Sequence, residues 1–238
     1  MARSSDGVVK TIHTEYKMGR RRIGGFDIFL FLFLTLLALT CLFPFYNVVL
    51  LSFADQAVAA SHPVYVVPLS FTLNSYYMIF REAAFLRSFL VTVVVVVVRT
   101  ALNMVLTTAG AYALSKKAMP GRNIMLSLIT FTMFFGGGLI PWYLVLKELG
   151  LINKLASMII PSAISTFNLI IMKNYFNTLN PGFEESARID GANDIYILIR
   201  IIIPISMPIM ATITLFYAVG AWNEWFNALI LISEPKLY

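Results

Sequence analysis

The sequence predicts an all-α fold, a polytopic bundle of transmembrane helices. Of its 238 residues, 59% are hydrophobic and only 13% are charged, whereas a soluble domain carries about 25% charged residues. Several apolar stretches reach the roughly 20 residues that cross about 30 Å of hydrocarbon. The formal net charge of +6 comes from basic residues beside these stretches, so it fits the positive-inside rule better than nucleic-acid binding.

Residues 1–25 are polar and basic, and we expect them to form a cytoplasmic segment ahead of a membrane domain over 26–238. The first apolar stretch is too long for a signal peptide and no small-residue cleavage site follows it. The predicted spans are 26–53, 86–115, 123–146, 154–174 and 195–222.

The loops between these spans divide into two kinds. We expect residues 54–85 to lie outside, with prolines at 63 and 68 and a short helix over 74–81. Basic residues instead mark the loops expected in the cytoplasm: Lys116, Lys117, Arg122, Lys173, Arg188 and Arg200. The run 93–98 consists of valines, but in a bilayer only a helix satisfies its backbone.

The segment over about 178–208 is polar although apolar runs flank it. Asn180 can cap a helix, and Pro181 suits the first helical position. Asp190-Gly191 then predicts a helix end in the left-handed conformation. Asn193 can cap a second helix that enters the last span. We therefore expect a short surface helix, a turn and a membrane helix.

This segment resembles the EAA loop of ABC importer membrane subunits. The match consists of Glu185-Ser186-Ala187, Asp190-Gly191-Ala192 and Pro204, with Ser186 in place of the first alanine. The resemblance extends over nearly the whole chain to the carbohydrate-uptake, maltose-type permeases. Two further motifs fit that family, Ala111–Ser115 followed by Pro120-Gly121-Arg122, and Trp222–Phe226.

The resemblance implies a permease subunit of a binding-protein-dependent importer in the bacterial plasma membrane, with a carbohydrate substrate, expected to be an oligosaccharide. It implies a second permease, two cytoplasmic ATPases and an extracytoplasmic solute-binding protein as partners. The ATPases would bind ATP, because this chain has no GxxxxGK[ST] phosphate loop and no cofactor is expected in it. The residues implied in ATPase coupling are Glu184, Glu185, Ser186, Ala187, Asp190, Gly191 and Ala192.

The family commonly has six spans with both ends inside, whereas five are predicted here. We therefore expect a sixth helix beyond Tyr238, so that the sequence is a C-terminally truncated fragment. A natural five-span protein is the alternative.

Arg99 is the most costly residue to place in a bilayer, because it lies well inside the second span. Asn103 lies one turn further along the same face. Both could contact sugar hydroxyls or the carboxylate of an acidic sugar. An internal pair, or snorkelling of Arg99, is the alternative, and Arg99 does not belong to the family pattern.

Two aromatic groups are further candidates for the substrate pathway. Gly136–Gly138 interrupts the third span, as in helices that line transporter cavities, and Trp142 and Tyr143 follow. Trp222, Asn223 and Glu224 lie near the outer end of the fifth span. Packing or an interfacial aromatic belt explains the aromatic residues equally well, but explains Asn223 and Glu224 less well.

Pro204 and Pro208 are four residues apart and should kink the fifth span. They would shape a pathway or only the packing of the helices. The chain has one cysteine and two histidines, so neither a disulfide nor a metal site is expected. No nucleophile has a neighbouring base, so we expect no enzyme. An ion-coupled carrier or channel subunit remains the alternative function, although such a protein has no evident use for the polar segment.

Overall fold

The structure is a computed structural model that describes residues 24–55 and 71–234. Every regular element in these ranges is helical, which confirms the predicted all-α class. The chain divides into two units, residues 1–79 and 80–238, and each is described by itself. The predicted prolines of the first outer loop, at 63 and 68, lie outside the described residues.

The first unit contains the long helix α1 (Gly25–Ser52), whose apolar side chains are almost all exposed, as in a helix that faces lipid. Cys41 is one of these exposed residues. The Ser52 and Tyr76 hydroxyls lie 2.7 Å apart, so the end of α1 contacts α3 (Asn74–Arg81). The bounds of α3 are those predicted for the short outer helix.

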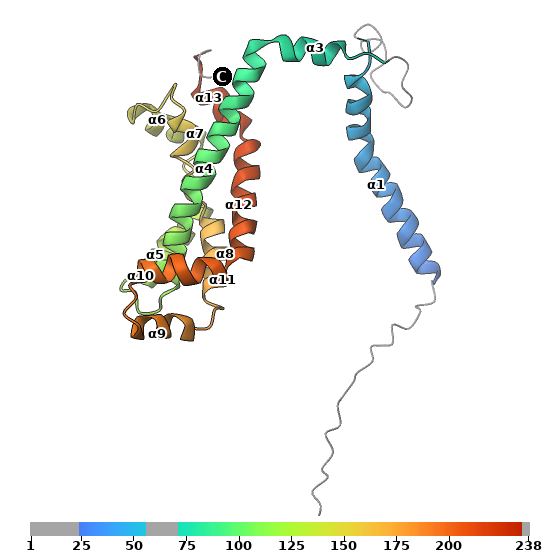
Figure 1. The fold of residues 1–238 in the computed structure, drawn as a ribbon. Helices are drawn as coiled ribbons and strands as arrows, with labels where there is room; N and C mark the ends of the chain where they lie inside the picture. Colours follow the sequence, from blue (N-terminus) through green and yellow to red (C-terminus); the bar gives the residue numbers. More distant parts are fainter. Residues whose placement is uncertain (1–23, 56–70, 235–238) are drawn as a thin grey trace, which may run out of the picture. The chain divides into compact units, whose positions relative to one another are not determined.

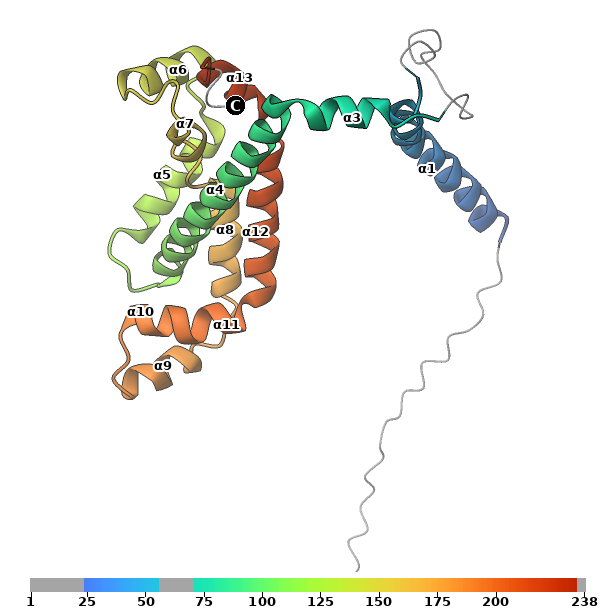
Figure 2. The same cartoon turned by 45° about the horizontal axis from the view of Figure 1, so that its top comes forward.

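The second unit is built around three helices, α4 (Ala83–Ser115), α8 (Thr166–Phe176) and α12 (Met207–Trp222), which run side by side in Figures 1 and 2. α4 is 33 residues long and packs against both other helices. One buried cluster joins the three helices to the segment after α8: Ala111, Tyr112, Met172, Phe176, Ala187, Ile197, Ile202, Ile213 and Tyr217.

The third predicted span, 123–146, is not one straight helix. It consists of α5 (Arg122–Phe134) and α6 (Leu139–Glu148), whose axes differ by 117°. The chain between them is non-helical, and Gly138 has φ 82°, a value that residues with a side chain rarely adopt. The glycine run therefore reverses the chain rather than merely interrupting a span.

The fourth predicted span, 154–174, is also interrupted. The four-residue helix α7 (Ala156–Ile159) precedes α8, and the residues from Ile160 to Ser165 between them are not helical. Pro161 lies in this gap, where its missing N–H removes no helical hydrogen bond. Ser165 caps α8 by accepting a hydrogen bond from the Asn168 backbone N–H at 3.4 Å.

The fifth predicted span, 195–222, has the predicted kink at Pro204 and Pro208, but the kink is sharp enough to divide the segment into separate helices. The chain runs through α10 (Asp194–Ile197), the π-helical turn η1 (Leu198–Ile202) and α11 (Ile203–Ile205), then turns by 88° into α12. Pro204 and Pro208 flank the turn at Ser206. The two prolines remove neighbouring helical hydrogen bonds, which makes a bend of this size possible.

Within residues 24–55 and 71–234, α1 and α4 can each cross a membrane by length and composition, and the number rises to four if each bent pair counts as one span. The remaining helices of these ranges are α9 (Gly182–Ile189) and α13 (Trp225–Leu231). Within the second unit, α9 and α10 lie at one end of the three-helix core, and α6 and α13 lie at the other (Figure 1).

Candidate functional site: a surface helix and a buried polar seam

The polar segment after α8 forms the predicted helix–turn–helix. The Asn180 carboxamide oxygen accepts a hydrogen bond from Gly182 N–H at 2.9 Å, which satisfies a free donor at the start of α9. The Asn193 oxygen does the same for Tyr196 N–H at 2.8 Å at the start of α10. The predicted cap of α10 at Asn193 is therefore confirmed. α9 begins one residue later than predicted, with Pro181 rather than Asn180 as its N-cap residue.

The turn between α9 and α10 explains the Asp190-Gly191-Ala192 triplet. Gly191 has φ 82° and its N–H donates to the Arg188 carbonyl at 3.0 Å. Ala192 N–H donates to the Ala187 carbonyl at 2.9 Å. This pair of bonds is the Schellman motif, which satisfies the last carbonyls of a helix and requires a left-handed residue where Gly191 stands.

α9 has an inner and an outer face. On the inner face, Ala187 is 8% exposed and belongs to the buried cluster with Tyr112 and Phe176. On the outer face, Glu185 and Ser186 are exposed. The Glu185-Ser186-Ala187 motif therefore lies on both faces of α9: Ala187 packs inward, and Glu185 points outward.

The structure brings the second family motif onto this inner face, which the sequence alone did not predict. Lys116, at the end of α4, forms an ion pair with Glu184 and lies 3.9 Å from the centre of the Tyr112 ring. Arg122 Nε donates to the Leu114 carbonyl at 2.7 Å and closes the turn between α4 and α5. The two motifs form one packed corner of the molecule.

A buried polar seam runs along α4 where it meets α12. Arg99, Asn103 and Thr107 follow one another at helical spacing and are 8%, 1% and 0% exposed. At its lower end, Thr107 Oγ1 lies 2.6 Å from the Tyr217 hydroxyl, which also accepts a hydrogen bond from Ser165 N–H at 3.0 Å. This end of the seam is fully hydrogen-bonded.

At the other end of the seam, around Arg99 and Asn103, several buried polar atoms lack a hydrogen-bond partner within the described part of the chain. Arg99 Nη2 lies 3.7 Å from Glu224 Oε2, which is within ion-pair range but too long for a hydrogen bond. Among the described residues, Arg99 Nε and both polar atoms of the Asn103 carboxamide have no hydrogen-bond partner. Buried groups without partners are rare and costly. The internal pair considered for Arg99 is therefore present, although Asn103 does not take part in it.

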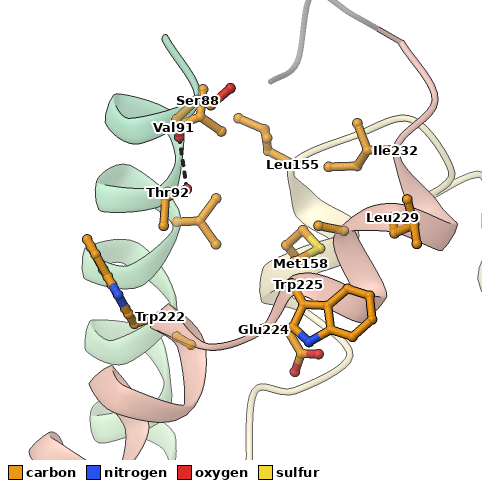
Figure 3. A pocket seen from close by; sticks show the side chains of 13 residues that line it. Ser88, Val91, Thr92, Leu155, Met158, Trp222, Glu224, Trp225, Leu229 and Ile232 are labelled. Carbon is orange, nitrogen blue, oxygen red and sulfur yellow. Dashed lines mark hydrogen bonds between the residues drawn. The ribbon is translucent and has the colours of Figure 1, made fainter. Parts of the chain in front are cut away.

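The tryptophans of the predicted pathway do not converge. Glu224, Trp222 and Trp225 border a cavity of about 580 Å³ between α4, α7 and α13. In Figure 3, Trp222 lies beside α4, while Trp225 and Glu224 lie on the α13 side. The Trp222 ring meets Phe89 edge-on at 6.0 Å, and Asn223 Nδ2 donates to the Val219 carbonyl at 2.8 Å. Trp222 and Asn223 therefore make these contacts within the chain and do not point toward one shared position where a ligand could bind.

Trp142 and Tyr143, the other predicted aromatic pair, are half-buried on α6. They pack against a second cluster formed by Val95, Leu146, Met158, Leu231 and Ile232. These contacts favour the packing role for both aromatic residues, which the sequence had left open.

No family model matches this sequence, but curated relatives do. The chain is 43% identical to Protein LplC of Bacillus subtilis over 94% of this chain and 75% of that protein. It is 42% identical to the polygalacturonan/rhamnogalacturonan transport system permease protein YtcP of Bacillus subtilis, over 88% of this chain and 73% of that one. A solved bacterial ABC transporter involved in the import of the acidic polysaccharide alginate superposes with a TM-score of 0.85 at 34% identity, covering 89% of this chain and 76% of its counterpart.

The chain belongs to the carbohydrate-uptake permease subunits of ABC importers. It is a multi-pass protein of the plasma membrane, and its family transports solutes rather than catalysing reactions. Membership in an ABC importer family implies a partner permease, an ATPase and a solute-binding protein. The ion-coupled carrier considered from the sequence receives no support from these relatives.

Proposed function

We propose that this permease subunit couples closure of an ATPase to oligosaccharide translocation through α9. The observation that carries this proposal is a polar helix, outside the apolar core, with large apolar side chains left in the open. Ile189 at the end of α9 is 86% exposed, and Ile195 on the following helix, α10, is 70% exposed. Exposed apolar side chains grouped at one end of a protein are typical of an interaction surface.

The same surface is hollowed. A cavity of about 580 Å³ lies between α9 and α10, bordered by the following residues: Ala187, Asp190, Gly191, Ala192, Asn193, Tyr196, Arg200 and Ile201. Asp190 borders this cavity, and Glu185 is exposed on the same helix, α9; both carboxylates can accept hydrogen bonds from a partner. A cavity with an apolar edge and a few polar groups suits a protein partner better than free solvent. We assign this surface to the ATPase.

The whole importer would then contain a second permease, two ATPases that bind ATP, and a solute-binding protein on the opposite side of the membrane. This chain would bind no cofactor. ATPase closure would move α9 as a rigid body and change the packing of the spans. The Schellman turn at Gly191 and the bend between Pro204 and Pro208 join α9 to α12.

An oligosaccharide is the proposed substrate, because YtcP is named for polygalacturonan and rhamnogalacturonan and the solved relative for alginate. Within this chain, the proposed pathway contacts are Arg99, Asn103, Trp142, Tyr143, Trp222, Asn223 and Glu224. The unpaired Asn103 amide and the loosely paired Arg99 support a polar route beside α4. The packing of Trp142 and Tyr143 makes them weaker candidates.

Crosslinking tests the docking surface. Cys41 is the only cysteine, so Cys41→Ser gives a background in which Ser186→Cys can carry a photoactivatable crosslinker. We expect ATPase capture in native membranes from position 186. Lys147→Cys, on α6 at the other end of the second unit (Figure 1), is the matched control and should capture no ATPase. The absence of a nucleotide-hydrolysing partner at position 186 would overturn the coupling role of α9.

Uptake measurements test the substrate class. The assembled importer in proteoliposomes is given labelled oligogalacturonides and labelled maltooligosaccharides, with the monosaccharides as controls. ATP-dependent uptake of either oligomer in preference to its monosaccharide supports the proposal. Uptake restricted to monosaccharides would contradict it.

A further inference from the structure

We infer that Lys116 is a positioning residue that fixes α9 to the end of α4, so that the force on α9 is delivered to α4 directly. This inference rests on the proposed coupling function of α9. It assigns Glu184 an inward, structural partner within this chain, in place of a contact with the ATPase.

Three contacts support a fixed joint between the two helices. Lys116 forms an ion pair with Glu184, and their side chains are 25% and 23% exposed, so neither is fully solvated. The same ammonium group lies 3.9 Å above the Tyr112 ring, within the range of a cation–π interaction. Tyr112 is 6% exposed and shares the buried cluster with Ala187 of α9.

These contacts come from one face of each helix. Tyr112 and Lys116 are four residues apart and therefore lie on the same side of α4. Glu184 and Ala187 are three residues apart on α9 and meet that side together. The next residues along α9, Glu185 and Ser186, face away and are exposed. α9 thus presents one face to α4 and leaves the other for a partner.

The covalent connections of α9 are poorly suited to transmit force. It follows the non-helical residues at Asn180 and Pro181, and it ends at Gly191, whose φ of 82° marks a turn rather than a continuous helix. Turns bend more easily than helices because fewer hydrogen bonds hold them. The side-chain joint is therefore the stiff connection from α9 to the core, and it leads to α4, the helix that also carries Arg99.

A partly exposed ion pair contributes little to folding stability, so its removal should leave the subunit folded. Its loss should instead weaken coupling. Lys116→Met keeps most of the aliphatic chain and removes the charge, and Glu184→Gln removes the opposite charge. Lys117→Met is the matched control, because Lys117 is the exposed neighbour on the same turn.

The experiment uses the complete importer in proteoliposomes, with the labelled oligosaccharide that the wild-type complex takes up fastest among those named above. The measured quantity is oligosaccharide transported per ATP hydrolysed. We expect Lys116→Met and Glu184→Gln each to lower this ratio at least about fivefold, the lower end of typical coupling effects. ATPase co-purification should be unchanged, and Lys117→Met should behave as wild type.

The charge-reversed double variant, Lys116→Glu with Glu184→Lys, distinguishes a joint from a general charge effect. It should recover part of the lost ratio, because it restores the ion pair but not the cation–π contact with Tyr112, whereas either reversal alone should recover none. An unchanged ratio in Lys116→Met, or no recovery in the double variant, would overturn the inference. Failure to capture an ATPase from Ser186→Cys would contradict the proposed function instead, so the two failures are distinguishable.

A second measurement tests the rigidity of the joint. In the Cys41→Ser background, Lys116→Cys and Glu184→Cys are joined by a short bifunctional thiol reagent. If α9 and the end of α4 move as one body, the joined subunit retains transport. Without the reagent, each single cysteine variant should show the same lowered ratio as Lys116→Met, because each removes one charge of the ion pair. If joining the two cysteines stops the residual transport of the double variant instead of raising it, the helices separate during the cycle and the fixed joint is wrong.

Discussion

The Arg99 guanidinium on α4 and the carboxylate of Glu224, the residue that precedes α13, approach to 3.7 Å, and they are buried to different degrees. The Arg99 side chain is 10% exposed and that of Glu224 is 25% exposed. The arginine therefore depends on its partner more than the glutamate does. This asymmetry predicts unequal effects of removing either charge.

Glu224→Gln should destabilise the protein more than Arg99→Met. The first change leaves a buried guanidinium without a counter-charge, at a cost of about 3 kcal/mol. The second leaves a partly solvated carboxylate, at a cost of about 1 kcal/mol. Thermal unfolding of the purified subunit in detergent measures both losses of stability. The stability of the double variant should be close to that of Arg99→Met. Equal shifts, or a larger shift for Arg99→Met, would show that the pair is not buried as described.

Tyr217→Phe should cost more stability than Thr107→Val. The phenol hydroxyl contacts both Thr107 Oγ1 and Ser165 N–H, so its removal leaves one buried and one partly buried group without a partner, at about 1–3 kcal/mol. Thr107→Val leaves the bond to Ser165 in place and should cost about 1 kcal/mol. Thr212→Val, which removes only an exposed bond to the Pro208 carbonyl, is the control and should be nearly neutral in the same unfolding assay.

Gly191→Val should abolish transport while the subunit still inserts in the membrane. A β-branched residue at φ 82° is strained by about 1–3 kcal/mol, and relief of this strain would displace α10 from α9. Gly191→Asn is the matched control, because asparagine tolerates the left-handed conformation, and it should retain part of the activity. Uptake and membrane content are measured together. Full uptake by the valine variant would remove the role of the turn.

Substitutions on the two faces of α9 should have different effects on stability. Ala187→Leu overfills the cluster around Tyr112 and Phe176 and should cost about 1–3 kcal/mol in detergent unfolding. Ser186→Leu adds the same side chain on the exposed face and should leave stability unchanged while it weakens ATPase binding. Similar unfolding temperatures for the two variants would contradict the inward placement of Ala187.

The local features of the coupling segment were predictable because each depends on neighbouring residues. Asn180, Gly191 and Asn193 act on N–H groups or dihedrals within three residues of themselves. The bend at Ser206 was predictable in place but not in size. Proline indicates where a helix loses hydrogen bonds, whereas the 88° angle depends on what the two halves pack against.

The long-range pairs could not be predicted from the pattern of a single sequence. Lys116 with Glu184 and Arg99 with Glu224 join residues far apart in the chain, and no spacing rule connects them. Tyr217 and Thr107 were missed for the same reason, since a tyrosine or threonine in an apolar span usually only packs. The one available signal was the cost of Arg99 in a bilayer, which indicated that some partner had to exist.

The position of the Tyr217 hydroxyl limits where this subunit can deform. The Tyr217 hydroxyl on α12 is hydrogen-bonded to Thr107 on α4 and to Ser165, the N-cap residue of α8. Sliding any one of these helices past the others would therefore break a hydrogen bond. We therefore expect α4, α8 and α12 to move together as one rigid body. The gating movement would be confined to its margins, where the chain reverses between α5 and α6 and where a second permease would abut.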